Sequence, residues 1–447
     1  MAYNTIDNGF IRFHRVRIPR TNLLMRYSTV SRDGSYASSP LREKLLYGGM
    51  LRGRKMILKN AAFRLAQALT IATRYSTVRL QGQPFTNPTH QEPTIMSYKH
   101  QQHRLLTNIA KSYTMLFASR ISTEEYEVYY EDQLRARGDS SNLGYVHMIM
   151  CGLKAWGTQT TFEGADDARR MCGGHGYMMT SGLGDIVNSV GATCTFEGEN
   201  YVMWGQVGKY LWKEMSRKLL PGDLQYVDEH RGRLHHKLCD KVDTDFLSHQ
   251  LLVKIFQHRA ARLITYAHNL VSKAVANGIR PLMAENNYGF ELMQAGRAHI
   301  ELYVLQSSIL ILSRLDIDHP STPPAIIDAL TSMITLFGLS TIASPLSTSS
   351  VTFLEDGYIS NDQLGSMREH IDLLVETLAP DALALTDAWN FSDASMASAI
   401  GCYDGDVYPR IMSWVKQLQI NVDAEKTGNI VKNSWKDYTE PMVKSKL

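Results

Sequence analysis

The sequence Ala168-Arg-Arg-Met-Cys-Gly-Gly-His-Gly-Tyr177, followed by Cys194-Thr-Phe-Glu-Gly-Glu-Asn200, decides how this chain folds and what it can bind. Glycines at 173, 174 and 176 have no Cβ, so backbone amides can approach a ligand's phosphates and positive φ angles carry no steric cost. Glu197 stands before Gly198, where the chain can turn sharply, and an apolar helical pattern follows. A carboxylate placed at such a turn can point into a pocket and serve as a general base.

Each half of this pattern also has a purely structural interpretation. The glycines lack the strand and the G-x-G-x-x-G spacing of a dinucleotide-binding turn, so a plain loop is an alternative. Glu197 and Glu199 are also typical of a helix start, where the macrodipole stabilises acidic residues. The tetrapeptide Thr161-Phe-Glu-Gly164 repeats Thr195-Phe-Glu-Gly198, so the pattern alone does not choose between Glu163 and Glu197 as the base.

Apolar residues recur every three to four positions on both sides of these motifs, which predicts a mostly helical chain. The predicted helices of a first bundle are Leu45 to Arg79, Arg104 to Arg137, Gly144 to Arg170 and Tyr201 to Lys218. Beyond a polar connection from Pro221 to Thr244, those of a second bundle are Phe246 to Asn277, Tyr288 to Leu315, Ala325 to Phe337, Gln363 to Leu378 and Val407 to Leu418. Ser360-Asn-Asp-Gln363 fits a capping box. The segment 340–350, rich in Ser, Thr and Pro, is predicted to be a loop.

The opening segment has a different pattern. Phe10, Phe13 and Val16 are compatible with strands, and residues 1–27 are interpreted as the end of a β-domain. A linker rich in Ser, Gly and Pro is predicted from Ser31 to Pro40. Gly48, Gly49 and Gly53 interrupt the first helical pattern and indicate a late helix start or close packing.

The run Ala168 to Tyr177 with Cys194 to Asn200 resembles the signature region of the peroxisomal acyl-CoA oxidases, within the acyl-CoA dehydrogenase superfamily. Other segments match this family in order along the chain. They are Asn8-Gly-Phe-Ile-Arg-Phe13, Arg17-Ile-Pro-Arg20, Arg74-Tyr-Ser-Thr-Val-Arg79 and Tyr403-Asp-Gly-Asp-Val-Tyr408. The last three residues, Ser445, Lys446 and Leu447, form a peroxisomal targeting signal.

The resemblance implies a role for each matching residue. Glu197 corresponds to the base that removes the α-proton of an acyl-CoA thioester while the β-hydrogen leaves as hydride to FAD. Gly173 and Gly174 correspond to residues beside the adenosine diphosphate part of FAD, and Arg79 to the arginine at its pyrophosphate. Glu199 and Asn200 are expected near the flavin of their own subunit. Because the Arg79 and glycine contacts cross to the neighbouring subunit's flavin in this superfamily, a homodimer is implied.

The second helical bundle and the terminal Ser-Lys-Leu resemble the oxidases of the superfamily, which pass electrons to O2 and release H2O2. Family members carry an N-terminal helical domain and a β-barrel domain before the segment at which this chain begins. The sequence is therefore interpreted as a truncated member, a shortened isoform or an incomplete gene model.

Composition excludes several other classes of protein. With 447 residues, 44% hydrophobic and 20% charged, the chain is expected to fold into two or three domains. Its net charge of +3 suits an anionic ligand, but Lys and Arg do not cluster as nucleic-acid binding requires. Five cysteines without C-x-x-C spacing are expected to be reduced, and His235-His236 lack a third metal ligand. No apolar run is judged long enough for a membrane span.

The predicted fold class is mainly α, with two helical bundles of the acyl-CoA oxidase C-terminal type and a short β-domain remnant. The expected divisions are 1–30 for the remnant, 41–220 and 245–430 for the bundles, and 431–447 for the tail with the targeting signal. The expected function is FAD-dependent oxidation of acyl-CoA to trans-2-enoyl-CoA in the peroxisome, after delivery by the import receptor. The alternative is an inactive family member that acts as a dimerisation or interaction protein. A helical scaffold unrelated to the family would leave the ordered motifs unexplained.

Overall fold

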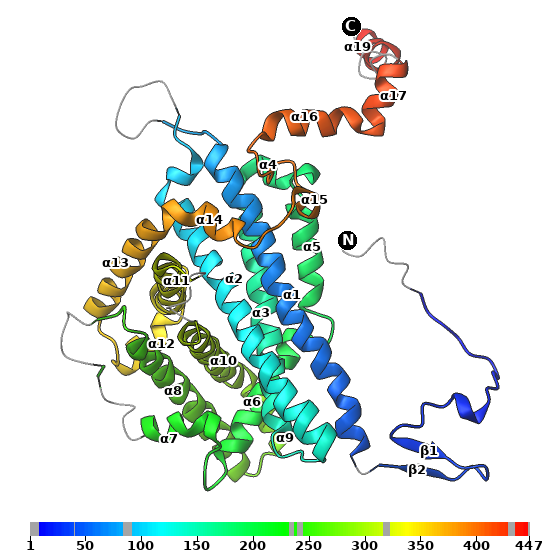
Figure 1. Cartoon of the computed structure of the whole chain (residues 1–447), viewed down its shortest axis with the longest axis vertical. Coiled ribbons are helices and arrows are strands. Elements are labelled where there is room, and N and C mark those ends of the chain that lie inside the picture. The colour runs from blue at the N-terminus through cyan, green and yellow to red at the C-terminus, as the bar shows by residue number, and fades with distance from the viewer. Residues whose placement is uncertain are drawn as a thin grey trace.

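The computed structural model describes residues 9–39, 41–83, 92–231, 237–238, 245–315, 322–427 and 434–445. The described chain is mainly α-helical, as predicted, and its long helices pack against one another in one bundle (Figure 1). Some of the sequence-based predictions fall outside the described ranges. They concern residues 1–8, His235, His236, Cys239, Lys446 and Leu447.

The first group of helices contains the motifs singled out in the sequence. Its long members are α1 (Arg42–Val78), α2 (Lys99–Tyr126), α3 (Leu143–Met171) and α6 (Asn200–Met215), and its short members are α4 (Gly173–Tyr177) and α5 (Leu183–Thr193). Helix α2 continues as a π-helix over Glu127–Ala136. Helix α1 packs against α2 and α3, and α5 packs against α3. The four predicted helices of this group are confirmed, whereas α4 and α5 were not predicted.

Gly48, near the start of α1, permits close packing, and neither it nor Gly49 or Gly53 interrupts the helix. Gly48 faces Tyr130, and a Cβ at Gly48 would come within 1.7 Å of the Tyr130 ring. The Tyr130 hydroxyl donates a hydrogen bond to the carbonyl of Leu45 at 2.6 Å. Glycine in a helix interior is unfavourable by about 0.5–1 kcal/mol relative to alanine, and here the close approach of the tyrosine offsets that cost.

The second group of helices follows residue 224. Its long members are α8 (His249–Ala276), α10 (Gly289–Ser313), α11 (Pro324–Ala343) and α13 (Asn361–Leu378), and its short members are α7 (Gln225–Arg231), α9 (Pro281–Asn287), α12 (Ser350–Asp356) and α14 (Ala382–Asp387). The predicted capping box at the start of α13 is confirmed, with Ser360 and Gln363 exchanging both hydrogen bonds. The predicted loop at 340–350 begins later than expected because α11 continues to Ala343.

One hydrophobic core runs through both groups of helices. It extends along the chain from Leu58 in α1 to Ile411 in α16 (Val407–Gln417). Helix α10 packs against α8 and α11 on one side and against α2, α3 and α6 on the other. The two predicted bundles are therefore joined by a continuous buried surface.

Helix α11 corrects the expectation that no apolar run is long enough for a membrane span. Among the residues that the structure describes, this one helix is long and apolar enough to cross a membrane by length and composition. It packs against α13 and α2, and half of its most apolar window is buried within the protein. A core helix of a folded domain passes the same test, so this finding is weak evidence for a span.

The N-terminal segment differs from its predicted pattern. The positions Phe10, Phe13 and Val16 lie outside any strand, and their side chains are 93%, 75% and 61% exposed. The strands are instead β1 (Ser28–Val30) and β2 (Tyr36–Ser38), an antiparallel pair at the predicted linker. In Figure 1 this hairpin lies beyond one end of α1, away from the helical core. The apolar residues Phe10, Phe13 and Val16 favoured a strand by their residue types. A stable strand also requires a partner strand, which these residues do not have in the described structure.

The C-terminal helices extend away from the bundle at its opposite end (Figure 1). They are α16, α17 (Gln419–Thr427) and α19 (Glu440–Lys444), whereas the short α15 (Asp393–Met396) lies beside α5. Ser445, the first residue of the predicted targeting signal, follows α19 directly, and its hydroxyl donates to the carbonyl of Met442 at 2.9 Å.

Asp223, at the junction of the two groups, predicts a pH dependence of stability. Burial raises the pKa of Asp223 from 3.8 to about 6. Because the folded pKa exceeds the unfolded one, the stabilising contribution is fully present below pH 4 and is lost as pH rises through 6. We expect Asp223→Asn to stabilise the chain by about 1–3 kcal/mol at pH 7.5 and to change it little at pH 4. Urea unfolding at the two pH values measures this.

Tyr210 still has an acceptor in the Asp223→Asn variant, because its hydroxyl donates to an Asp223 carboxylate oxygen at 3.3 Å and an amide oxygen can replace it. Exposed Asp132→Asn is the control and should leave the difference between the two pH values unchanged. Equal effects of both substitutions would contradict the role given to Asp223.

Candidate functional site

Glu197 lies in the short connection between α5 and α6, on a backbone conformation that few residues adopt. Its φ angle is 55° and that of Gly198 is 105°. Positive φ is sterically unfavourable for a residue with a Cβ and persists only where the surrounding structure holds it. The Glu197 side chain is exposed. We refer to residues 194–200 as the Glu197 loop.

Two buried basic side chains hold the Glu197 loop from inside the protein. Nε of Arg54 in α1 donates to the backbone carbonyl of Glu197 at 3.1 Å. Nζ of Lys154 in α3 donates to the carbonyls of Cys194 at 3.2 Å and Gly198 at 2.6 Å. Arg54 is 3% exposed and Lys154 is 0% exposed. The carbonyls on both sides of Glu197 are thus tied inward, while its carboxylate stays accessible.

Gly53 leaves room beside this carboxylate. A Cβ at Gly53 would lie 3.4 Å from the carboxyl carbon of Glu197, which is ordinary contact distance. A side chain larger than alanine at this position of α1 would therefore displace the Glu197 side chain or cover it. The glycine that interrupts the apolar pattern of α1 thus keeps one side of the carboxylate open.

The two residues after Gly198 interact with the protein itself. Glu199 is the N-cap of α6, and its carboxylate accepts the amide hydrogens of Tyr201 at 2.8 Å and Val202 at 3.3 Å. Asn200 is 5% exposed, and its side chain bonds to Lys154 at 2.9 Å and to Thr158 at 3.0 Å. Through these contacts both residues shape the loop itself. Their contact with a cofactor stays a prediction.

Glu163, the competing glutamate of the repeated tetrapeptide, lies in the middle of α3. Its carboxylate accepts a hydrogen bond from the Gln159 side chain at 2.8 Å, one helical turn earlier. The same four letters therefore form a continuous helix at 161–164 and a loop with two positive φ angles at 195–198. Of the two glutamates, only Glu197 is presented on a loop.

A second site lies at the far end of α1, where the structure brings Arg79, Gly173 and Gly174 together. All three line one pocket of about 410 Å³, which also includes Tyr75 and Gln101. We refer to it as the Arg79 pocket. Nη1 of Arg79 donates to the hydroxyl of Tyr408 at 2.8 Å, and this bond raises the pKa of Arg79 above its ordinary value. The Tyr403 to Tyr408 motif is thereby joined to the Arg74 to Arg79 motif.

The Arg79 pocket has the features that a phosphate group requires. Gly173 has a φ of 57°, and a Cβ at Gly173 or Gly174 would meet no atom within 4 Å, so both glycines border open space. Nδ1 of His175 is buried and has no hydrogen-bond partner among the described residues, and His175 also belongs to the pocket. A guanidinium, an open glycine backbone and an unpaired ring nitrogen together suit a pyrophosphate. The residues present therefore fit the diphosphate part of a dinucleotide cofactor.

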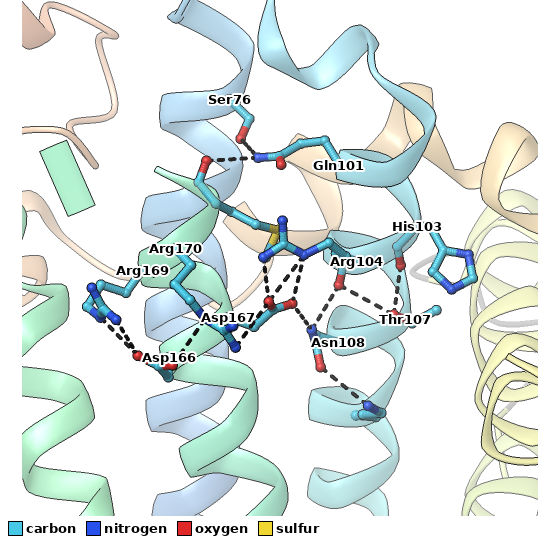
Figure 2. Close-up of polar contacts among 12 residues, drawn as sticks. Ser76, Gln101, His103, Arg104, Thr107, Asn108, Asp166, Asp167, Arg169 and Arg170 are labelled. Atoms are coloured by element: carbon cyan, nitrogen blue, oxygen red, sulfur yellow. Dashed lines mark hydrogen bonds and ion pairs between the residues drawn. The ribbon is translucent and has the colours of Figure 1, made fainter. Parts of the chain in front are cut away.

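Polar contacts between α2 and α3 fix the wall of the Arg79 pocket (Figure 2). Nε2 of Gln101 donates to the Ser76 hydroxyl at 3.0 Å and to the Met171 carbonyl at 3.2 Å. Arg104 forms a forked ion pair with Asp167, which Arg170 also approaches. These contacts hold the last turn of α3, from which the chain enters Gly173 and Gly174.

The two sites are far apart within one chain. Gly53 borders the Glu197 carboxylate and Arg79 follows the last residue of α1, 26 positions later. A helix rises about 1.5 Å per residue, so these positions are about 39 Å apart along α1. The sequence assigned Glu197 and Arg79 to one function, but the structure separates them by most of the length of α1.

Sequence analysis missed three residues that shape the Glu197 loop: Gly53 as a spacer, and Arg54 and Lys154 as donors. Lys154 offered a signal, because it stands within the apolar run Met148-Ile-Met-Cys-Gly-Leu-Lys-Ala-Trp156. A charged residue on an otherwise buried helix face requires polar partners inside the protein. Which acceptors it meets depends on the path of the chain 40 residues later.

Comparison with known proteins identifies the family. Residues 47–212 match the family model described as "Acyl-CoA oxidase, C-alpha1 domain", and residues 248–444 match that described as "Acyl-CoA oxidase". Acyl-coenzyme A oxidase acox-1.1 of Caenorhabditis elegans is 34% identical over 94% of this chain and 60% of its own length. Peroxisomal acyl-coenzyme A oxidase 1 of Rattus norvegicus is 33% identical over 94% of this chain and 62% of its own.

Solved structures agree with these matches. Acyl-CoA oxidase 1 of Arabidopsis thaliana superposes with a TM-score of 0.88 and 30% identity, over 100% of this chain and 65% of that one. Acyl-CoA oxidase-1 of Caenorhabditis elegans, complexed with FAD and ATP, gives a TM-score of 0.84 and 32% identity, over 97% and 62% of the two chains. The chain thus spans about 60% of the length of the curated relatives it matches. By sequence and by fold, it belongs to the acyl-CoA oxidase family.

Proposed function

We propose that this chain is an FAD-dependent acyl-CoA oxidase that converts acyl-CoA to trans-2-enoyl-CoA and passes the electrons to O2, giving H2O2. The observation that carries the proposal is the Glu197 loop. It presents one accessible carboxylate on a strained turn that two buried cations hold. A precisely placed carboxylate of this kind is what abstraction of a weakly acidic α-proton requires.

In this reaction Glu197 takes the α-proton of the acyl-CoA thioester on its carboxylate. The FAD that Arg79, Gly173 and Gly174 would hold would supply the acceptor for the β-hydrogen, as a hydride, and the route of the two electrons to O2. Gly53 carries no side chain that would crowd the carboxylate from the α1 side. Because Glu197 is exposed in the free chain, the bound acyl-CoA and cofactor must exclude water from it.

The Arg79 pocket is the part of this chain proposed to hold the cofactor. Arg79, Gly173 and Gly174 would contact the diphosphate, and His175 offers a ring nitrogen that meets no partner in the part of the chain that the structure describes. Relatives of known structure are complexed with FAD, which supports the assignment.

We further propose that the active form is a homodimer. The distance of about 39 Å along α1 is too large for Glu197 and Arg79 of one chain to meet at the same reacting group and diphosphate. A second copy would bring its Arg79 pocket to the flavin that serves the first copy's Glu197. Exposed Tyr177, Met179 and Tyr403, at 82%, 75% and 74%, lie near the Arg79 pocket and would be covered by that copy.

The proposed compartment is the peroxisome. Ser445, Lys446 and Leu447 form the expected signal for the import receptor, and several relatives are named as peroxisomal. A fluorescent fusion at the N-terminus should enter peroxisomes with the intact chain and stay outside when the three residues are removed.

Flavin binding and peroxide release on one sample test the proposed activity. The purified chain is titrated with FAD, its absorbance spectrum is recorded, and acyl-CoA-dependent H2O2 is then measured. Stoichiometric flavin with substrate-dependent peroxide supports the oxidase. A folded, helical, colourless protein without turnover would overturn it and favour the non-catalytic dimerisation or interaction protein.

Arg79→Met should weaken FAD binding by about 10- to 100-fold, since a charge-assisted hydrogen bond contributes about 1.5–3 kcal/mol. Fluorescence titration with FAD measures the change. Arg120→Met, which removes a 72% exposed arginine from α2, is the control and should bind FAD normally. Unchanged affinity in Arg79→Met would exclude Arg79 from the cofactor site.

Subunit mixing tests whether a site is shared between two copies. Glu197→Gln and Arg79→Met chains are first assayed separately. The FAD concentration is chosen to fill a site with intact Arg79 but not a site with the Arg79→Met substitution. Both variants should be nearly inactive. In a mixed dimer with shared sites, one site would combine intact Glu197 with intact Arg79. Mixing should then restore about a quarter of the unaltered activity. No recovery would show that each site is contained in one chain.

A further inference from the structure

Lys154 is a buried ammonium whose hydrogen bonds all go to neutral oxygens of the Glu197 loop. Its three acceptors are the carbonyl of Cys194 at 3.2 Å, the carbonyl of Gly198 at 2.6 Å and the side-chain oxygen of Asn200 at 2.9 Å. An ammonium has three N–H donors, so the loop uses them all. The acceptors lie on both sides of Glu197 in the sequence.

A second layer of contacts fixes Asn200. The Thr158 hydroxyl, one turn after Lys154 in α3, donates to the carbonyl of Lys154 at 2.8 Å. The amide nitrogen of Asn200 donates to the same hydroxyl oxygen at 3.0 Å. The start of α6 is thereby attached to one turn of α3 through Lys154, Thr158 and Asn200, all of which are buried.

Burying an ammonium without a carboxylate partner is unfavourable unless hydrogen bonds compensate for the lost water. Burial lowers the pKa of Lys154 to about 8, so the side chain still carries its proton at neutral pH. The positive φ angle of Glu197, a residue with a Cβ, is a further cost to the folded chain. Lys154 holds the carbonyls of Cys194 and Gly198, which stand on either side of the strained Glu197 in the sequence.

We propose that Lys154 is a positioning residue for Glu197: its ammonium holds the Glu197 loop in the conformation that presents the base. The proposal rests on the proposed function of Glu197. Lys154 itself does not contact substrate, because its side chain has no exposed surface. Arg54 holds the carbonyl of Glu197 from the α1 side, and Lys154 fixes both ends of the loop from the α3 side.

The test compares Lys154→Met with Lys213→Met. Methionine has nearly the length of lysine but no N–H donors, whereas Lys213 is exposed on α6 and serves as the control. In Lys154→Met, hydrogen exchange of the backbone amides at 194–200 should rise at least about tenfold, while α1 and α2 stay protected. In the flavin-loaded protein, kcat should fall about 10- to 100-fold with KM and FAD affinity nearly unchanged. Lys213→Met should change none of these.

Unchanged exchange at 194–200 in a folded Lys154→Met chain would overturn the proposal, as would a parallel loss of protection throughout α3. If Lys154→Met does not fold, Asn200→Ala removes one of the three acceptors and should give the same pattern at smaller amplitude. Exchange does not require turnover. If the unaltered protein has no oxidase activity but Lys154→Met still raises exchange at 194–200, the proposed reaction is rejected. The anchoring of the loop by Lys154 then still holds.

Discussion

Replacing Glu197 by glutamine should lower acyl-CoA-dependent peroxide release from the flavin-loaded protein by about 10²- to 10⁴-fold, the usual contribution of a general base. Glutamine has the same size and polarity but cannot take up the α-proton. The loop should persist, because the contacts that hold it involve the backbone carbonyls of residues 194, 197 and 198 and the Asn200 side chain. FAD binding should therefore stay within about twofold. Steady-state peroxide assays and an FAD titration measure the two quantities.

The repeated tetrapeptide supplies a matched control for this experiment. Glu163→Gln makes the same chemical change within the same four residues, but on the exposed face of α3. Its activity should match that of the unaltered protein. Retained turnover in Glu197→Gln, or an equal loss in Glu163→Gln, would reject Glu197 as the base.

Glu301→Ala should have the largest effect on stability, destabilising the chain by about 3–5 kcal/mol. Glu301 in α10 is 3% exposed and accepts a hydrogen bond from Nη2 of Arg259 in α8 at 2.6 Å. Arg259 is 2% exposed, so removing Glu301 leaves a buried guanidinium without its carboxylate. Arg297, the other partner of Glu301, is largely exposed and can return to water. Urea unfolding followed by circular dichroism measures the loss.

Two further variants separate the buried charge from the lost contact. Replacing both Arg259 and Glu301 by leucine removes the charges together and should recover most of the stability. Glu355→Ala breaks a 2.9 Å pair with Arg262, also in α8, but Glu355 is 58% exposed, so the loss should stay below about 1 kcal/mol. A double leucine variant no more stable than Glu301→Ala would show that shape, and not the unpaired charge, dominates at this position.

Local patterns in the sequence were sufficient to predict the long helices. Amphipathic runs such as those of α8 and α13 bury one face of the helix and expose the other, so apolar spacing alone identifies them. Helix α5 was missed because Leu183-Gly-Asp-Ile-Val-Asn-Ser-Val-Gly-Ala-Thr193 is short and contains two glycines and several β-branched residues. It is helical because α3 and α1 cover its apolar face.

The same distinction holds for the candidate site. The sequence by itself determined the helical class and the family, and it named Glu197, Arg79, Gly173 and Gly174 as candidate site residues, because motifs of neighbouring residues record local chemistry. Only the tertiary structure separated Glu163 in a helix from Glu197 on a loop, and only it brought Lys154 under the Glu197 loop. It also placed Arg79 about 39 Å along α1 from Gly53, which borders Glu197. Those results depend on contacts between groups that are 40 or more residues apart in the sequence. The spacing of residues along the chain does not reveal which of these groups meet.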